Sequence, residues 1–374
     1  MRVIISGGGT GGHIYPALAI ANRLARTVPK VQIMYVGTAG GLESDIVPRE
    51  GIPFCAIRAG GLERSFSWRN LVSLWASIQG FAASFRIIRN FRPEIVIGTG
   101  GFVSGPVLLA ARLQGIPTLI QEQNALPGIT NRVLSRFVNK IALGFSAAAA
   151  GFPPAVQHKL VVTGNPVREE IIAANREDGR REFGLSSDKL TVLVAGGSRG
   201  ARSINAAMLE VHKRFAGHPK VQILHATGTA GYDNYCHELA KAGIDIENSR
   251  NIIVKPYFYN MPAALAAADI VVFRAGAIGL AEIAVRGLPS ILVPYPFAAE
   301  NHQEVNARVM ERAGAAIVIL DKDLNGKSLA RTLETLLNDP DRLAEMAAAS
   351  RRLGVPDAAS RLASLVENLV KTKR

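Results

Sequence analysis

Short runs of apolar, mostly β-branched residues alternate along the chain with longer segments whose apolar residues recur every three or four positions. Uninterrupted apolar strands separated by helices of about 10–15 residues are typical of parallel sheets covered on both faces. The pattern therefore predicts an α/β protein. The expected strands lie at residues 3–6, 31–36, 54–57, 95–98, 118–120 and 140–143 in the first half, and at 191–195, 222–225, 252–255, 270–273, 290–293 and 316–320 in the second.

The two halves repeat one arrangement. Each opens with a strand that runs into a glycine loop and then a helix, at Gly7-Gly8-Gly9-Thr10-Gly11-Gly12 and at Gly196-Gly197-Ser198-Arg199-Gly200. This indicates two doubly wound, Rossmann-like domains in tandem. We expect an N-terminal domain at residues 1–163, completed by a last helix at 356–374, and a C-terminal domain at 164–355. The boundary falls in the turn residues Gly164-Asn165-Pro166.

Composition excludes several classes of protein. The 374 residues are 48% hydrophobic and 20% charged, which is ordinary for a globular chain and excludes a disordered one. The two cysteines, Cys55 and Cys236, cannot build a disulfide framework or a cysteine metal cluster. We recognise no signal peptide and no membrane-spanning segment, so we expect a cytoplasmic protein.

The excess of positive over negative charge is concentrated in the first half of the chain. The net charge is +13, of which residues 1–165 carry +10, and this predicts an anionic partner. Residues 64–93 contain five arginines, both tryptophans and no acid. A cationic helix with an aromatic face can lie in an anionic bilayer interface, although the same face could pack on the sheet. The expected membrane patch is Trp68, Leu71, Trp75, Ile78, Phe81, Phe85, Arg86 and Arg89.

The glycine loops fit two common nucleotide motifs only in part. Gly7-x-Gly9-x-x-Gly12 has the dinucleotide spacing, but no carboxylate follows the second strand until Glu43, which argues against a nicotinamide oxidoreductase. His13 and Ile14 stand where a P-loop needs Lys and Ser/Thr. The loops could merely allow tight turns. We favour ligand binding, because glycine clusters at strand carboxyl ends usually mark ligand clefts.

More polar clusters follow other strands. Gly98–Gly105 and Gln121–Asn124 come after strands of the first half, and Gly196–Arg199, Arg274–Glu282 and Glu300–Gln303 occupy equivalent places in the second. Because parallel strands end at one edge, the clusters of each domain should converge there. We expect the two edges to face each other across a cleft.

With these clusters, the chain resembles the MurG family of bacterial cell-wall glycosyltransferases (glycosyltransferase family 28). The resemblance covers essentially the whole chain. Its most specific pieces are Gly8–His13 with Pro16, Gly100–Pro106, Glu122–Asn124, Gly164–Arg168, Gly196–Arg202 and Arg274–Ala277 through Glu282. It implies the GT-B fold, with two Rossmann-like domains facing across a cleft. It also implies inverting transfer of N-acetylglucosamine (GlcNAc) from UDP-GlcNAc to the MurNAc 4-hydroxyl of undecaprenyl-pyrophosphoryl-MurNAc-pentapeptide (lipid I) in peptidoglycan synthesis.

The resemblance also implies roles for individual residues. His13 would be the base, a task that suits a side chain with a pKa near neutral. The acceptor side would include Phe102, Ser104, Glu122 and Asn131. The donor would be bound by Thr10, Gly11, Gly12, Asn124, Arg168, Ser198, Phe258, Ala277, Ile278, Gly279, Leu280, Ala281, Glu282 and Gln303. Within that set the helix start at Ala277 would hold the diphosphate and Glu282 the ribose hydroxyls.

Simpler interpretations stay open for several of these residues. His13 could cap its helix or bind a phosphate, Glu282 could be an ordinary first-turn acid, and Arg168 could form an ion pair at the domain boundary. Residues 278–281 read Ile-Gly-Leu-Ala and lack hydroxyls, so only their backbone can contact a ligand. Asp321-Lys322-Asp323 and Asp339-Pro340-Asp341 match the D-x-D pattern, and we interpret both as helix-start acids.

The predicted partners are UDP-GlcNAc, lipid I and the anionic cytoplasmic face of the bacterial inner membrane, where the protein would be peripheral. Cell-wall synthesis and division proteins are further possible partners. No nucleic-acid motif accompanies the positive charge, so we expect no nucleic-acid partner. The residues indicate no tightly bound cofactor and no protein-bound metal, and they leave open whether a divalent cation such as Mg²⁺ takes part. The alternative function is transfer of another nucleotide sugar to another lipid, such as a diacylglycerol.

Overall fold

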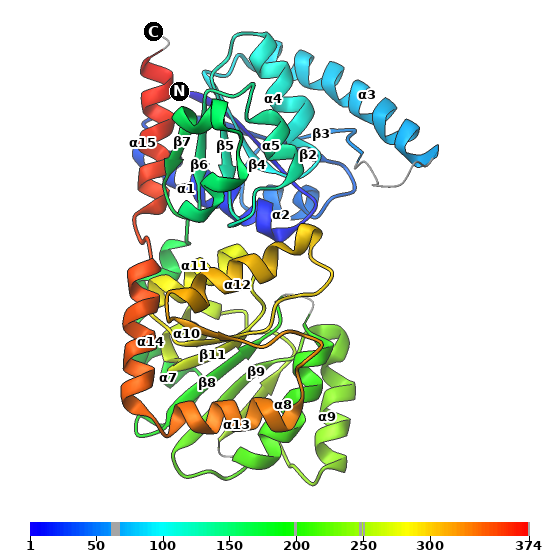
Figure 1. The fold of residues 1–374 in the computed structure, drawn as a ribbon. Coiled ribbons are helices and arrows are strands. Elements are labelled where there is room, and N and C mark those ends of the chain that lie inside the picture. Colours follow the sequence, from blue (N-terminus) through cyan, green and yellow to red (C-terminus); the bar gives the residue numbers. More distant parts are fainter. Residues whose placement is uncertain (61–67, 198–199, 247–248, 250, 373–374) are drawn as a thin grey trace. The chain divides into compact units, whose positions relative to one another are not determined.

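The computed structural model describes residues 1–374 except 61–67, 198–199, 247–248, 250 and 373–374, and of residues 68–74 it describes the backbone only. The chain forms two compact units (Figure 1). The first contains Met1–Val167 and Val355–Arg374, and the second contains Arg168–Gly354. The chain therefore leaves the first unit four residues after the expected end at residue 163, and returns to it one residue before 356.

The first unit is built on a seven-stranded sheet in the order β3-β2-β1-β4-β5-β6-β7, and every pairing is parallel. Six of these strands agree with those expected from the sequence, and the seventh, β7, which is short and partly exposed, was not expected. The strands are β1 (Arg2–Gly7), β2 (Gln32–Thr38), β3 (Phe54–Ile57), β4 (Ile95–Gly100), β5 (Thr118–Glu122), β6 (Lys140–Leu143) and β7 (Leu160–Val162).

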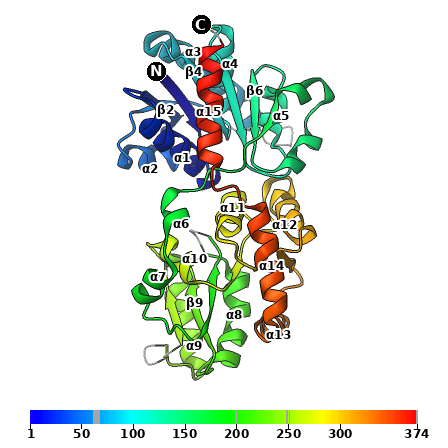
Figure 2. The same ribbon diagram turned by 90° about the vertical axis from the view of Figure 1, so that its left-hand side faces the viewer.

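Helices cover both faces of this sheet, because successive strand residues point to opposite sides. Val3 and Ile5 pack with α1, α2 and α15, whereas Ile4 packs with α3, α4 and α5. The chain's last helix, α15, packs along α1 (Figure 2). The helices are α1 (Gly11–Thr27), α2 (Glu43–Arg49), α3 (Trp68–Phe91), α4 (Ser104–Leu113), α5 (Ile129–Leu134) and α15 (Ala358–Lys371), with short 3₁₀ turns at Ser146–Gly151 and Pro154–Lys159.

The second unit repeats the design with a six-stranded parallel sheet in the order β10-β9-β8-β11-β12-β13. All six strands agree with the sequence prediction to within two residues at each end. They are β8 (Leu190–Ala195), β9 (Val221–Ala226), β10 (Ile252–Lys255), β11 (Ile270–Phe273), β12 (Ser290–Leu292) and β13 (Ala316–Val318). In both sheets the first strand is central and the order reverses beside it, which defines a doubly wound fold.

The helices of the second unit also divide between the two faces of its sheet. Val192 and Val194 of β8 pack with α8 (Arg202–Phe215), α9 (Tyr232–Lys241) and α13 (Gly326–Leu337). On the other side α10 packs on β8 and on α7. The remaining helices are α6 (Glu169–Ala173), α7 (Arg176–Glu182), α10 (Met261–Ala267), α11 (Ala277–Arg286), α12 (His302–Arg312) and α14 (Pro340–Leu353).

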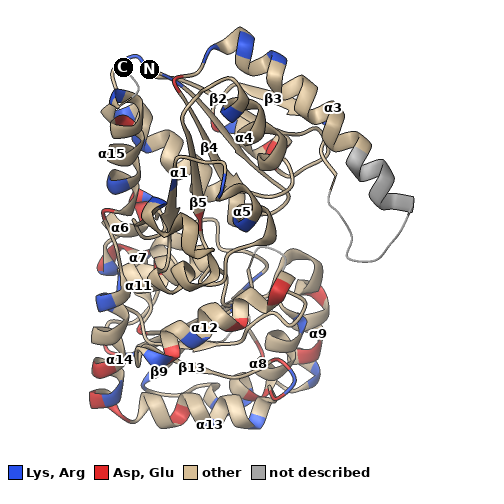
Figure 3. Cartoon of the chain, turned by 45° about the horizontal axis from the view of Figure 1, so that its top comes forward, with Lys and Arg blue, Asp and Glu red and all other residues tan. Residues whose placement is uncertain are grey.

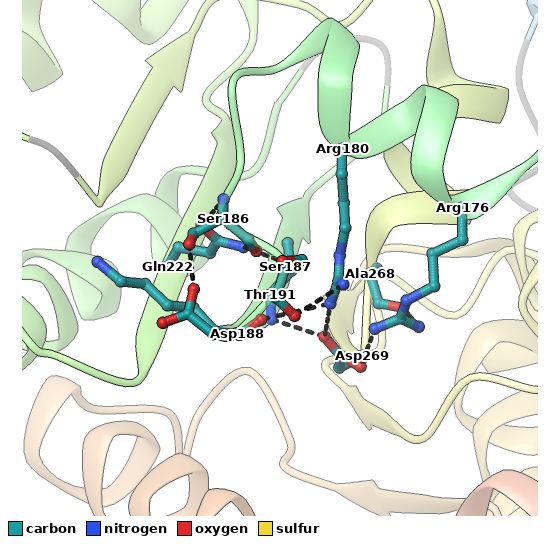
Figure 4. Close-up of polar contacts among 10 residues, drawn as sticks. Arg176, Arg180, Ser186, Ser187, Asp188, Thr191, Gln222, Ala268 and Asp269 are labelled. Carbon is teal, nitrogen blue, oxygen red and sulfur yellow. Dashed lines mark hydrogen bonds and ion pairs between the residues drawn. The ribbon is translucent and has the colours of Figure 1, made fainter.

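Asp269 fixes the amino-terminal edge of the second sheet (Figure 4). Its carboxylate accepts a hydrogen bond of 2.8 Å from the backbone N–H of Thr191. It also pairs with Arg176, and with Arg180 at 3.7 Å, both from α7. These charge-assisted bonds tie α7 to the starts of β8 and β11. The glycine loops and polar clusters lie at the opposite, carboxyl edge.

Candidate functional site

His13 lies on the first turn of α1, at the carboxyl edge of the first sheet. Its Nδ1 atom is 2.9 Å from the backbone oxygen of Thr99, after β4, and 3.2 Å from Oε1 of Gln123, after β5. Burial lowers the pKa of His13 below its ordinary value, although both hydrogen bonds and the charge of Glu43 oppose that shift. The side chain is therefore neutral at neutral pH and suited to accept a proton.

Glycines bring the loops of the first unit into direct contact with one another. Gly100 and Gly101 have positive φ angles of 109° and 80°. A Cβ atom on Gly100 would lie 2.6 Å from Nδ1 of His13, and one on Gly101 would lie 2.4 Å from the backbone oxygen of Gly8. Larger residues would therefore push apart the β1–α1 and β4–α4 loops.

The backbone N–H groups at the start of α1 are accessible and are not capped by a side chain. The N-cap residue Thr10 makes no side-chain capping bond, and Thr10 and Gly12 are exposed. The first N–H groups of a helix have no partner within the helix, and the helix dipole adds positive potential there. Thr10, Gly11 and Gly12, which the sequence singled out, therefore form a turn beside His13 whose backbone N–H groups suit an anion.

Glu43 is a buried carboxylate for which sequence reasoning found no role. It is fully buried at the first residue of α2 and accepts hydrogen bonds from the N–H of Gly9 at 3.0 Å and from the N–H and hydroxyl of Thr38 at 3.0 and 2.6 Å. Burial raises the pKa of Glu43, but the bonds from Thr38 and Gly9 outweigh it, so the pKa lies below its ordinary value. This buried carboxylate supports the glycine loop.

Three of the four predicted acceptor-side residues are buried and occupied with internal bonds. Ser104 Oγ donates to backbone oxygens of Ser6 and Gly100. Glu122 accepts from Asn131 Nδ2 at 2.7 Å and from two backbone N–H groups of its own loop. Burial raises the pKa of Glu122, against these bonds. Ser104, Glu122 and Asn131 thus shape the loops, and the arrangement does not support a direct acceptor contact. Phe102, which is 59% exposed, can make one.

Asn124, predicted to reach the donor, lies on the same loop in the first unit. Its backbone N–H donates to Glu122 Oε1 at 2.9 Å and its side-chain nitrogen to the same oxygen at 3.3 Å. The side chain is half-buried. Glu122 therefore fixes the position of Asn124 at the carboxyl edge of the sheet.

In the second unit the structure brings together two of the predicted donor residues. Arg168 Nη2 donates to Oε1 of Glu282 over 3.3 Å, and the Glu282 side chain is 12% exposed. Burial raises the pKa of Glu282, while the charge and hydrogen bond of Arg168 lower it. Glu282 belongs to the second turn of α11, which excludes the interpretation as a plain first-turn acid.

The start of α11 presents backbone donors with almost no side-chain chemistry. Its N-cap is Gly276, which has no side chain to satisfy the first N–H groups. Ala277, Ile278, Gly279 and Ala281 carry no polar side-chain atom, and Leu280 is fully buried. Only the backbone of this turn can contact a ligand, and its N–H groups and dipole favour an anion.

The other predicted donor residues differ in how they are placed. Gln303 Oε1 accepts from the backbone N–H of Tyr295 at 2.9 Å. Phe258 is 2% exposed and packs edge-on against Phe183, with ring centroids 5.2 Å apart, so this arrangement does not support a nucleotide contact through its ring. Ser198 lies outside the described residues.

Arg274, quoted in the sequence motif without a role, is the centre of a network at this edge. Its guanidinium donates to Asp321 Oδ1 at 2.5 Å, to Ser203 Oγ at 2.9 Å and to the backbone oxygens of Val293 and Pro294. It therefore ties together the ends of β11 and β12, the start of α8 and the loop after β13. The only sequence signal was an arginine directly after a buried strand.

Of the two acids expected at helix starts, Asp321 and Asp339, the first expectation is wrong and the second is confirmed. Asp321 is not a helix-start acid, because it pairs with Arg274 while Asn325 caps α13 by accepting from the N–H of Ser328 at 2.9 Å. Asp339 does cap its helix, accepting from the N–H of Arg342 at 2.9 Å. Within the described residues, no group of three or more His, Cys, Asp and Glu side chains could hold a metal ion.

Two doubly wound parallel sheets in one chain, each the core of its own compact unit, define the two-domain GT-B architecture. Residues 3–143 match the glycosyltransferase family 28 N-terminal domain and residues 191–362 match the family's C-terminal domain. The chain belongs to glycosyltransferase family 28.

Full-length relatives and a solved structure agree with this assignment. The chain is 52% identical over 370 residues to a UDP-N-acetylglucosamine–N-acetylmuramyl-(pentapeptide) pyrophosphoryl-undecaprenol N-acetylglucosamine transferase of Desulforamulus reducens, covering 99% of each chain. It is 51% identical to the transferase of the same name from Desulforudis audaxviator, over 99% of this chain and 98% of that one. The crystal structure of Acinetobacter baumannii MurG superposes with a TM-score of 0.77 at 29% identity, over 98% of this chain and 99% of that one.

Proposed function

We propose that this protein transfers GlcNAc from UDP-GlcNAc to the MurNAc 4-hydroxyl of lipid I, with inversion, to give lipid II in peptidoglycan synthesis. The observation that carries the proposal is the pairing of Arg168 with Glu282 beside the bare first turn of α11. A nucleoside diphosphate sugar presents a diphosphate and two ribose hydroxyls. A helix N-terminus and a nearby buried carboxylate suit these two groups.

The second unit binds the donor in this proposal. The N–H groups of Ala277, Ile278 and Gly279 hold the diphosphate and stabilise the charge that develops on the leaving UDP. Glu282 accepts hydrogen bonds from the ribose hydroxyls, and Arg168 opposes the rise in the pKa of Glu282 that burial causes. Gln303 contacts the sugar, and the backbone around Phe258 contacts the nucleotide.

The first unit supplies the base and the acceptor site. His13 takes the proton from the acceptor hydroxyl as its oxygen attacks the anomeric carbon and the bond to UDP breaks with its electron pair. A single displacement of this kind inverts the configuration. In this proposal Thr10, Gly11, Gly12 and Asn124 contact the donor, and Phe102, whose side chain is exposed, contacts the acceptor. Ser104, Glu122 and Asn131 act by holding their loops.

The described part of α3 supports docking to an anionic membrane surface. Trp75, Ile78 and Phe85 are 62%, 51% and 36% exposed, and Arg86 and Arg89 are exposed beside them. This stretch of α3 carries basic and no acidic residues (Figure 3). Phe81 instead packs partly buried against the core, which removes it from the expected patch. The side chains of Trp68 and Leu71 lie outside the described residues.

We therefore propose that the enzyme is a peripheral protein on the cytoplasmic face of the bacterial inner membrane. Among the described helices, none combines the length and the apolarity that crossing a bilayer requires. Exposed aromatic and aliphatic side chains with flanking arginines suit an interface rather than a span.

The test is UDP release from UDP-GlcNAc, with and without a short-chain lipid I analogue. We expect release that depends on the analogue. Replacing Glu282 with Ala should weaken the apparent affinity for UDP-GlcNAc about 10- to 100-fold, because a hydrogen bond to a charged group is worth about 1.5–3 kcal/mol. Glu345→Ala, an exposed acid on α14, is the matched control and should leave the rate unchanged.

Two results would contradict the proposal. UDP binding without release on the lipid I analogue, but with release on diacylglycerol, would assign the enzyme to another lipid acceptor. Unchanged kinetics of Glu282→Ala would remove the assigned donor site.

A further inference from the structure

Three buried side-chain amides form a chain that ends on the imidazole of His13. They are Gln121, Gln123 and Asn165, which are 0%, 1% and 4% exposed. Gln121 belongs to β5, Gln123 to the loop that follows it, and Asn165 to the segment after β7, all within the first unit. Buried amides are shielded from water and must form their hydrogen bonds with one another, so the orientation of each amide constrains the next.

A backbone carbonyl fixes the far end of the chain. Asn165 Nδ2 is 2.9 Å from the backbone oxygen of Gln123, which only accepts, so the amide nitrogen must face it. Asn165 Oδ1 then faces Gln121 Nε2 at 3.0 Å. Gln121 consequently turns its own Oε1 toward Gln123 Nε2.

A second carbonyl fixes the near end. Gln123 Nε2 is 2.7 Å from the backbone oxygen of Thr99 and 3.0 Å from that of Gln121. Rotating this amide by 180° would set its oxygen against three other oxygens, so the nitrogen belongs there. Gln123 Oε1 is therefore the atom that faces His13 Nδ1 at 3.2 Å.

His13 Nδ1 thus meets two acceptors, the carbonyl oxygen of Thr99 at 2.9 Å and Oε1 of Gln123. Two acceptors require a proton on Nδ1. In the neutral imidazole the lone pair then resides on Nε2.

We propose that Gln123 is a positioning residue which, with the Thr99 carbonyl, locks His13 in the Nδ1–H tautomer and makes Nε2 the proton-accepting atom. This inference rests on the proposed function only in taking His13 as the base. The acceptor O–H bond breaks and its proton goes to Nε2. The acceptor oxygen bonds to the anomeric carbon, and UDP leaves with the electrons of its bond. Gln123 and Thr99 accept from Nδ1–H throughout, and so stabilise the imidazolium that forms.

The first test reads the tautomer directly and needs no substrate. In protein labelled with ¹⁵N-histidine, two-bond ¹H–¹⁵N correlation spectra distinguish a protonated Nδ1 from a protonated Nε2. The His13 signals are those missing from the His13→Gln variant. We expect a protonated Nδ1 above the pKa of His13. A protonated Nε2 in the wild-type protein would overturn the proposal even if every variant at position 123 failed to fold.

The second test compares a replacement that adds a carboxyl group at position 123 with one that only removes the hydrogen-bond acceptor. Gln123→Glu sets a carboxyl group against Nδ1–H, and its second oxygen replaces Nε2 among the oxygens of Thr99 and Gln121, so this carboxyl ionises only at raised pH. Where it is ionised, its charge should raise the pKa of His13 and move the acid limb of kcat to higher pH by about one pH unit or more. Gln123→Met removes the acceptor, so kcat should fall about ten-fold or more while the KM for UDP-GlcNAc stays within about two-fold. Glu43, on α2, is the charged group that acts on His13, and it is unchanged in both variants.

Gln32→Glu is the matched control for added charge, because Gln32 is exposed at the start of β2, the end of the strand remote from His13. It should leave the pH profile unchanged. Equal shifts in the Glu and Met variants would indicate a merely structural role and overturn the proposal. If the wild-type enzyme transferred no GlcNAc, the proposed function would fail, while the tautomer measurement would still decide the role of Gln123.

Discussion

The carboxylate of Glu43 accepts a hydrogen bond of 3.0 Å from the backbone N–H of Gly9, 34 residues earlier in the chain. Three glycines leave room for this carboxylate. A Cβ atom on Gly8 or Gly41 would lie 2.3 Å from its Oε1, and one on Gly37 would lie 2.6 Å from its Cγ. The geometry of the glycine loop beside His13 therefore depends on a single buried acid.

Glu43→Gln should destabilise the protein by about 1–3 kcal/mol, because an amide nitrogen in place of Oε2 leaves the Gly9 N–H without an acceptor. The midpoint of urea unfolding measures this loss, and Glu50→Gln, on the exposed residue after α2, is the control. The pKa of Glu43 is lower in the folded protein, so its stabilisation is full above the ordinary value and is lost as the pH falls through the folded value. Equal stability of Glu43→Gln and wild type would contradict this role.

Arg274 and Asp321 should be strongly coupled. Replacing Arg274 with Met leaves Asp321 and Ser203 without their shared partner, so we expect a loss of about 1–3 kcal/mol and a higher KM for UDP-GlcNAc. In a double-mutant cycle with Asp321→Asn, the coupling energy should be about 1–3 kcal/mol. The exposed pair Arg342–Glu345 on α14 should couple by less than about 0.5 kcal/mol. A coupling near zero for Arg274 and Asp321 would show that the two contribute independently.

The second unit should lose stability in acid because of two buried histidines. His212 bonds to Tyr235 at 3.1 Å and His225 to Asn205 at 3.2 Å. Burial lowers the pKa of His212 to about 3. Burial also lowers the pKa of His225 well below its ordinary value, and the charge that His212 carries when protonated adds to this effect. Both stay neutral when folded but take up a proton when unfolded below about pH 6.5.

The free energy of unfolding should accordingly fall as the pH drops from about 6.5 toward 3, by at most about 1.4 kcal/mol per pH unit for each histidine. Urea unfolding across this range measures the slope. His225→Leu should make the slope smaller, whereas His237→Gln, on an exposed histidine of α9, should leave it unchanged. An identical slope in His225→Leu would assign the acid sensitivity to other groups.

Replacing both Trp75 and Ile78 with Ser should reduce binding to anionic vesicles without unfolding the protein, because both side chains are more than half exposed. Cosedimentation with phosphatidylglycerol vesicles measures the fraction bound, and thermal unfolding checks the fold. Val162→Ser, on the half-exposed strand β7, controls for the loss of exposed apolar surface. Unchanged cosedimentation of the double variant would leave α3 without the proposed membrane role.

The strands could be predicted well because a buried parallel strand needs a continuous apolar run, a pattern readable without any partner. β7 was missed because half of its surface is exposed and its three residues carry too weak a signal. The helix-start role was right for Asp339 and wrong for Asp321. A local cap depends on residues within one turn, whereas the partner of Asp321 is Arg274, 47 positions away.

The sequence by itself determined the two α/β halves, the strands, the glycine loops and the residues around which a site could form, because each depends on local periodicity or spacing. Tertiary structure decided which of the candidate site residues are buried and which are paired with one another. It buried Ser104, Glu122 and Phe258, paired Arg168 with Glu282, and set Gln123 against His13. Burial and hydrogen bonding join residues that are distant along the chain, and only the folded packing specifies those partners.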